Sequence, residues 1–88
     1  TGAKLGNINA LNTDFTDAVM REVDLEKADL RNSVLDGADL SGSDLSQSDL
    51  GGASLRATNL SGAKLNEANV AETDFTGAIL DPDALNNA

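Results

Sequence analysis

Leucine recurs at every fifth position along the middle of this 88-residue chain, and this spacing restricts the fold more than any other feature. No fifth position is missed between residues 25 and 65, and the same register extends over residues 5–80. Eleven of the sixteen central positions are Leu, two are Phe, and Met, Val and Ala occur once each. The large side chains on this register form the predicted core ladder: Leu5, Phe15, Met20, Leu25, Leu30, Leu35, Leu40, Leu45, Leu50, Leu55, Leu60, Leu65, Val70, Phe75 and Leu80.

A period of five fits neither of the common regular elements. On an α-helix, each step of five residues turns the side chain by about 140°, which would spread the leucines around the whole helix. On a continuous strand, an odd spacing would send successive leucines to opposite faces. A chain that bends at a right angle after every five residues can instead point all of them at one axis. Four units then close a coil of 20 residues, and the sixteen units make four coils.

A second track of small residues supports this coil. Two residues before each centre, fourteen of the sixteen positions are Ala, Ser or Thr, which fit inside a coil where a neighbouring Leu leaves little room. Ile8 and Ala10 invert this pattern, which predicts either an exchange of volumes or a distortion of the first coil. Gly and Asn tolerate the positive φ that tight turns often require, so we expect the corners at Asn7, Asn12, Asn32, Gly37, Gly42, Gly52, Gly62 and Gly77.

The repeated units resemble a known motif. ADLRN, SVLDG, ADLSG, SDLSQ, SDLGG, ASLRA and TNLSG, residues 28–62, are similar to the A(D/N)LXX repeats of pentapeptide-repeat proteins. The resemblance implies an all-β fold, a right-handed quadrilateral parallel β-helix (β-solenoid) of about four coils. We expect residues 1–88 to form a single domain in which residues 3–82 carry the repeats.

The two ends of the solenoid differ in sequence. After Leu80 the repeat gives way to Asp81-Pro82, which is similar to a helix start. We therefore predict a short helical cap over residues 81–88, with Pro82 at its start and Leu85 laid over the last coil. Thr1 and Gly2 offer no such lid, so we expect the N-terminal end to remain open to a second copy, a partner or an upstream segment.

The residues that most often carry chemistry are absent. The chain has no His, Cys, Tyr or Trp, which removes the common general base, the thiol nucleophile and the usual nitrogen and sulfur metal ligands. We expect no enzyme activity, no cofactor and no metal site. Asp recurs in the repeats, but consecutive aspartates lie on different faces. Asp24 and Asp44 stack on one face with few other acids beside them, so we predict no calcium site.

Charge and hydropathy restrict the partners. Fifteen acids against six bases give a net charge of −9, which disfavours direct nucleic-acid binding. No run approaches the roughly 18 apolar residues of a membrane span. Four apolar residues are predicted to point outward and are the candidate contact residues: Leu11, Val19, Val34 and Ile79.

The resemblance implies a non-catalytic structural or protein-interaction scaffold. Its partner would be an unidentified protein, in a larger photosynthetic complex for example, or a second copy bound through a solenoid end. The thylakoid lumen and the bacterial cytoplasm or periplasm are the expected locations. The alternative is an acidic DNA mimic that binds a DNA-handling enzyme such as gyrase. The charge favours it, but the short length and the presence of only two Phe do not. Ice or carbohydrate binding would require a ladder of outward Thr, and Thr16 and Thr76 are too few.

Overall fold

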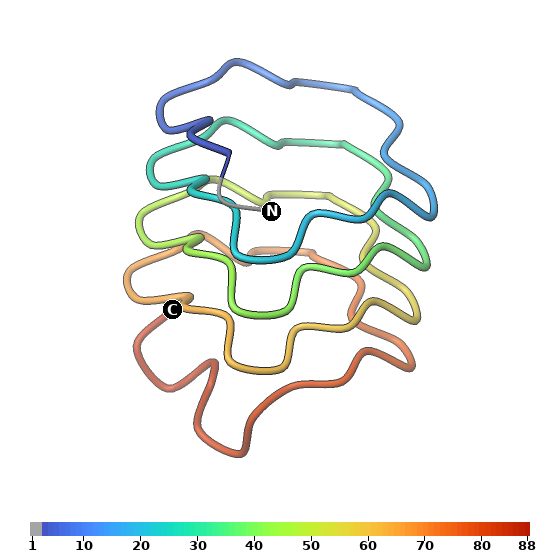
Figure 1. Ribbon diagram of the computed structural model, residues 1–88, viewed down its shortest axis with the longest axis vertical. Helices are drawn as coiled ribbons and strands as arrows, with labels where there is room; N and C mark the ends of the chain where they lie inside the picture. Colours follow the sequence, from blue (N-terminus) through green and yellow to red (C-terminus); the bar gives the residue numbers. More distant parts are fainter. Residues whose placement is uncertain (1–2) are drawn as a thin grey trace.

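The computed structural model describes residues 3–88. The backbone winds into stacked coils that follow one another from the N-terminal to the C-terminal end (Figure 1). Single residues on successive coils pair as isolated parallel β-bridges, and among the described residues there is neither a helix nor an extended strand. The bridges join Lys4–Asp24, Asn9–Asp29, Asp14–Val34, Val19–Asp39, Asp24–Asp44, Asp29–Asp49, Val34–Ser54, Asp39–Asn59, Asp44–Lys64, Asp49–Asn69, Ser54–Asp74 and Asn59–Ile79.

Every bridge joins residues that are 20 apart, so one coil contains four five-residue units. We number the coils by residues: 3–22 is the first, 23–42 the second, 43–62 the third and 63–82 the fourth. Successive coils are joined by backbone hydrogen bonds. The Leu25 N–H donates to the Asp44 carbonyl at 2.8 Å, and the Asp44 N–H donates to the Val23 carbonyl at 3.0 Å. This pattern recurs along the stack and satisfies backbone groups that would otherwise be costly to bury.

Each corner of a coil is a tight turn with a left-handed third residue. In a typical corner the Ala28 N–H donates to the Leu25 carbonyl at 3.0 Å, and Lys27 has a φ of 62°. A positive φ at this position alone is the mark of a type II turn. The positive φ expected at the Gly and Asn corners is confirmed, and seven further corners have it with other residues: Asp17, Glu22, Lys27, Gln47, Ala57, Glu67 and Glu72.

The core is a continuous column of aliphatic side chains. The nine central leucines from Leu25 to Leu65 are at most 1% exposed. In the end coils, Leu5, Phe15, Val70, Phe75 and Leu80 are half-buried and pack against this core.

The inverted unit of the first coil keeps the regular backbone. Ala10 is 7% exposed, and the half-buried Ile8 packs against the core. The Ala10 N–H donates to the Asp29 carbonyl at 2.8 Å, in the same register as the other centres. The large and small side chains have therefore exchanged volume without distorting the coil.

The C-terminal tail differs from the predicted helical cap. Residues 82–87 form turns and not a helix, with the Ala84 N–H donating to the Asp81 carbonyl at 3.0 Å. Ala84 packs against the core as a half-buried residue, whereas Leu85 is exposed, at 38%. The absence of a lid expected at Thr1 and Gly2 concerns residues outside the described part of the chain.

Two residues explain why the coil stops where it does. Pro82 occupies the next corner position, where the fifteen preceding corners all have a positive φ, and the proline ring holds φ near −65°. Asp83 follows on the inward small track, where an unpaired carboxylate would lose its hydration. The tail returns instead to the side of the body: Asp81 Oδ2 accepts the Gly62 N–H at 3.0 Å, and the Asn87 carbonyl accepts the Glu67 N–H.

Candidate functional site

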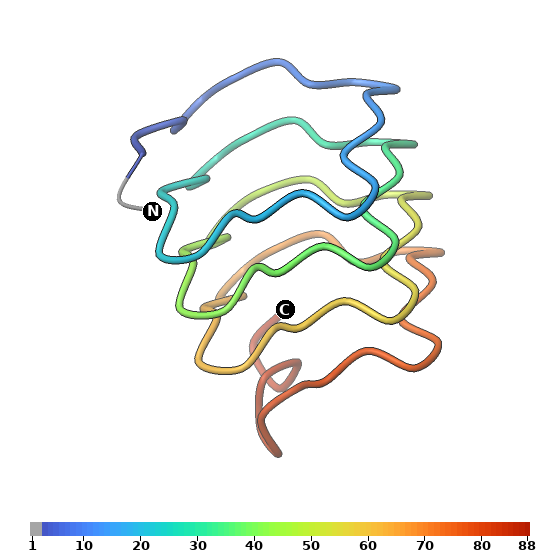
Figure 2. The same ribbon diagram turned by 45° about the vertical axis from the view of Figure 1, so that its right-hand side comes forward.

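The outer surface is divided into four faces, because equivalent units stack directly below one another (Figure 2). We name each face by its central residues. The first face is centred on Leu5, Leu25, Leu45 and Leu65, and the second on Ala10, Leu30, Leu50 and Val70. The third is centred on Phe15, Leu35, Leu55 and Phe75, and the fourth on Met20, Leu40, Leu60 and Leu80. Function must be sought on these faces and at the ends of the stack, because the inward residues fill the core.

The recurring Asp and Asn residues have a structural role. In the residue before each centre, Oδ1 accepts the backbone N–H two residues later, as in an Asx turn: Asp24 accepts the Glu26 N–H at 3.0 Å and Asp44 the Ser46 N–H at 2.9 Å. The same bond joins Asn9 to Leu11, Asp14 to Thr16, Asp29 to Arg31, Asp39 to Ser41, Asp49 to Gly51, Asn59 to Ser61, Asn69 to Ala71 and Asp74 to Thr76. These side chains cap the corners, which explains why they recur.

Hydrogen bonds within these caps lower the pKa of several aspartates. The side chains of Thr16 and Thr76 and the neighbouring N–H groups hold the pKa of Asp14 and Asp74 below the usual value. Ser41 acts in the same way on the pKa of Asp39, and Ser46 on that of Asp44. The pKa of Asp29 is lowered chiefly by its hydrogen bond to the guanidinium of Arg31. These carboxylates are therefore stabilised in their charged form by contacts made within the repeat.

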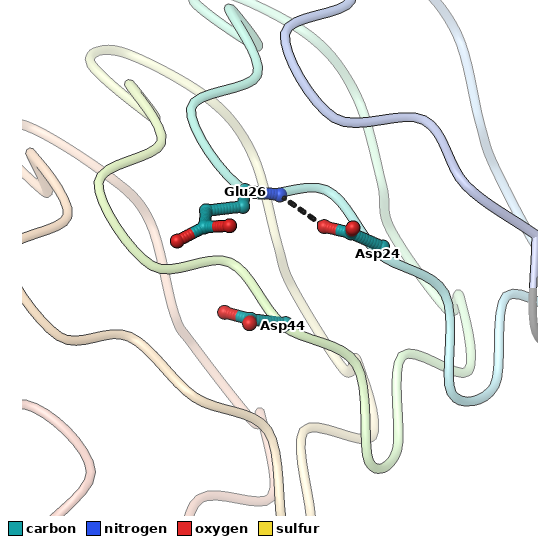
Figure 3. Close-up of side chains that lie close together, drawn as sticks. All are labelled: Asp24, Glu26 and Asp44. Atoms are coloured by element: carbon teal, nitrogen blue, oxygen red, sulfur yellow. Dashed lines mark hydrogen bonds between the residues drawn. The ribbon is translucent and has the colours of Figure 1, made fainter.

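Three acids of the first face lie close together (Figure 3). Asp24, Glu26 and Asp44 can each place one carboxylate oxygen within 4.8 Å of the other two. Sequence reasoning had stacked Asp24 on Asp44 but had missed Glu26, which reaches the pair from the corner beside Asp24. Both aspartates already serve as corner caps, and the positive charge of Lys64 in the next coil lowers the pKa of Asp44. We therefore assign no ion to this cluster.

The fourth face combines exposed apolar side chains with a polar centre. Val19 is 67% exposed and Ile79 is 58% exposed, and they occupy the first and last positions of one bridged column. Asp39 and Asn59 lie between them in this column. A second column lies parallel to the bridged column and is made of the residues that follow each bridge residue by two positions in the sequence: Arg21, Ser41, Ser61 and Asp81. A shallow depression of about 410 Å³ opens beside it, lined by Arg21, Glu22, Ser41 and Gly42.

The structure does not gather all four candidate contact residues into one patch. Leu11, on the second face, is 40% exposed, and Val34, on the third face, is half-buried. Val19 and Ile79 share the fourth face and are separated by three coil steps, or about 14 Å. No helix within residues 3–88 has the length and hydropathy needed to cross a membrane.

Comparison with known proteins adds the following. The family model described as pentapeptide repeats matches in eight copies, over residues 1–37, 14–52, 33–70 and 53–81. The chain is similar to the crystal structure of alr5209 from Nostoc PCC 7120, a pentapeptide-repeat protein, with 40% identity, a TM-score of 0.69 and coverage of 92% of this chain and 63% of that one. It is also similar to Rfr23 from the cyanobacterium Cyanothece 51142, with 29% identity, a TM-score of 0.48 and coverage of 80% and 61%.

The chain thus spans less than two thirds of the length of these two solved relatives. A search of curated proteins found no match.

Proposed function

Since this chain belongs to the pentapeptide-repeat family, we propose that it is a non-catalytic scaffold that binds another protein through its outer faces. Family membership also supports the right-handed winding that the repeats led us to expect, and a single domain over residues 1–88. Similarity to a cyanobacterial protein supports a photosynthetic setting.

One observation carries this proposal. At the position before the centre, Val19 and Ile79 stand where the repeat most often has Asp or Asn, and both are more than half exposed. An Asp there would cap the corner, so each apolar residue gives up a hydrogen bond that ten other units make. A side chain that sacrifices a cap and exposes apolar surface is best explained by a contact with another molecule.

The test compares two immobilised forms of the protein in a native cyanobacterial extract. The parent chain is expected to retain a protein that the double variant Val19→Asp/Ile79→Asp retains at least about fivefold less. Asp is the usual residue of the repeat at both positions, so the variant should fold, which circular dichroism would check. Leu11→Asp, which changes an exposed apolar residue of the second face, serves as the matched control. Equal retention by parent and double variant would contradict the proposal.

The alternative is an acidic DNA mimic that binds a DNA-handling enzyme such as gyrase. It is favoured by the net charge of −9, which lies on all four faces of the body. The experiment is a supercoiling assay with purified gyrase and increasing amounts of the chain. Inhibition that disappears when surface aspartates are replaced by Asn would support the mimic. Unchanged supercoiling at about a hundredfold molar excess of the chain would exclude it.

A further inference from the structure

We propose that the fourth face binds the fourth face of a second copy, with the two solenoid axes antiparallel. This proposal shares the exposed Val19 and Ile79 with the scaffold role above, but it is tested on the purified chain alone, so that the failure of one proposal can be told from the failure of the other. It follows from the order of residues down each face, which the fold brings into straight columns.

The geometry is that of a two-fold axis lying in the contact plane and running across the coils. Such an axis places the first coil of one copy opposite the fourth coil of the other, and the second opposite the third, while each column faces itself in reverse order. An interface of this kind is isologous: if a residue contacts a second residue of the partner copy, the reverse contact forms as well.

On the fourth face this operation brings complementary side chains together. In the bridged column, Val19 faces Ile79 of the second copy, and Asp39 faces Asn59. In the neighbouring column, Arg21 faces Asp81 and Ser41 faces Ser61. Apolar groups thus meet apolar groups, and the one cation of the face meets an anion. Each of these pairs forms twice.

The hydrogen-bonding state of Asp39 and Asn59 suits this pairing. Asn59 Oδ1 accepts the Ser61 N–H at 3.1 Å, which orients the amide and leaves Nδ2 available to donate. Asp39 Oδ1 accepts both the N–H and the hydroxyl of Ser41, at 3.1 and 2.7 Å, so Oδ2 is the atom left to accept from the second copy. Within residues 3–88, the ion-pair contact of Oδ2 is a long one, 3.9 Å from Arg21 Nε.

The other three faces do not complement themselves in this way. The same operation would place Lys4 against Lys64 and Asp24 against Asp44 on the first face, and Asp29 against Asp49 on the second. On the third face it would place Asp14 against Asp74. Like charges opposed across a contact disfavour it, so of the four faces only the fourth is suited to this pairing.

Charge also decides the orientation on the fourth face. If the axes were parallel, equivalent coils would face each other, and a two-fold axis along the bridged column would place Asp39 against Asp39 of the second copy. The body measures 28 × 23 × 23 Å, so one side offers about 500 Å² per copy, which is at the lower limit for a specific interface. We therefore expect a weak dimer with a Kd on the order of 100 µM.

The first experiment is sedimentation equilibrium of the purified chain from about 10 µM to 1 mM in about 150 mM NaCl, a salt level that screens distant repulsion. Asn59→Asp keeps the corner cap but opposes two carboxylates at each of two symmetric sites, and should raise the Kd at least tenfold. Asn9→Asp makes the same change at the same repeat position on the second face and should leave the Kd unchanged. A parent chain that stays monomeric at 1 mM, or an equal effect of both variants, would overturn the proposal.

The second experiment tests the orientation. The chain has no Cys, so single cysteines can be introduced at Val19 and Ile79 without competing thiols. Under mild oxidation, a mixture of Val19→Cys and Ile79→Cys chains should form mixed disulfide dimers faster than either variant forms its own. In the antiparallel pair, two copies of Cys at position 19 lie about 14 Å apart, too far for a disulfide. Preferential cross-linking of either variant with itself would refute the antiparallel arrangement.

Discussion

Ser43→Ala is expected to destabilise this protein much more than Ser48→Ala, although both serines are buried on the same inward track. The Ser43 hydroxyl donates to the Met20 carbonyl at 2.6 Å and accepts the Val23 N–H at 3.1 Å. It therefore bridges a corner of the coil above. At fourteen other corners the N–H donates directly across the turn, but the direct bond between Val23 and Met20 is not formed.

The Ser48 hydroxyl has a smaller role. It donates to the Leu45 carbonyl at 2.6 Å, and this carbonyl already accepts the Ser48 N–H at 3.1 Å. Removal of the hydroxyl leaves that carbonyl bonded. Ala itself fits the track, since Ala28 and Ala38 occupy it at 1% exposure. Any difference between the two variants therefore reports on hydrogen bonding and not on packing.

The magnitudes follow from these bonds. Ser43→Ala removes two hydrogen bonds to buried backbone groups, each worth about 0.5–1.5 kcal/mol net, so the loss is about 2 kcal/mol. The loss approaches about 1 kcal/mol if the corner relaxes to form the direct bond, and about 3 kcal/mol if it does not. Ser48→Ala removes one bond whose acceptor remains satisfied, which costs about 0.5 kcal/mol or less.

Urea unfolding followed by far-ultraviolet circular dichroism measures the free energy of unfolding of each variant. The two variants have the same length and composition, so they can be compared directly. The m-values of the variants should match that of the parent, because little surface area changes. Amide hydrogen exchange adds a local readout, since Val23 should exchange faster in Ser43→Ala and keep its parental rate in Ser48→Ala. Equal losses of stability, or a larger loss in Ser48→Ala, would refute the reasoning.

Four further predictions concern the repeat and its end. Leu45 is 0% exposed, so Leu45→Ala should lower the free energy of unfolding in urea by about 2–5 kcal/mol. Leu5 is only half-buried, so Leu5→Ala should lower it clearly less, and equal losses would contradict the core described above. Ala57→Gly should gain about 0.5–1 kcal/mol, because relief of a left-handed alanine, worth about 1–2 kcal/mol, exceeds the added chain entropy of Gly, and a loss of stability would contradict it. The melting temperature should fall as the pH drops below about 4, since capping aspartates with a lowered pKa stabilise the fold only while charged. The measurement is made in about 0.5 M NaCl, which screens charge repulsion. A melting temperature that rises instead would contradict the stabilising role of the capping aspartates. Pro82→Gly/Asp83→Ala should let Leu85 stack below Leu65 as a seventeenth unit, slowing amide exchange at Leu65 at least tenfold, whereas unchanged exchange would show that other residues end the coil.

Much of the fold could be predicted because every five-residue unit repeats the same local sequence pattern. Leu at each centre and Ala, Ser or Thr two residues earlier require that both side chains point inward, and one bend per unit satisfies this requirement. The Gly and Asn residues at the corners predicted the positive φ that the bend requires. Local rules of this kind need no knowledge of distant residues, which is why the corners could be placed by residue number.

The tail shows where local rules failed. Asp81-Pro82 has the local signature of a helix start, and Leu85 is still in register with the core ladder. The outcome depended on two properties of the body that no short segment contains: the positive φ required of every corner, and the inward direction of the position that Asp83 would occupy. The tail therefore formed turns, in which Ala84 packs against the core and Leu85 is exposed.

By itself, the sequence determined the coil of 20 residues, the aliphatic core and the outward position of the charges, because a strict period acts through nearest neighbours. Only the tertiary structure decided which side chains from different coils meet. Glu26 joined Asp24 and Asp44, and Ser43 bridged the coil above while Ser48 did not. These contacts between coils join residues 18 to 23 positions apart, and their geometry exists only once the coils are stacked.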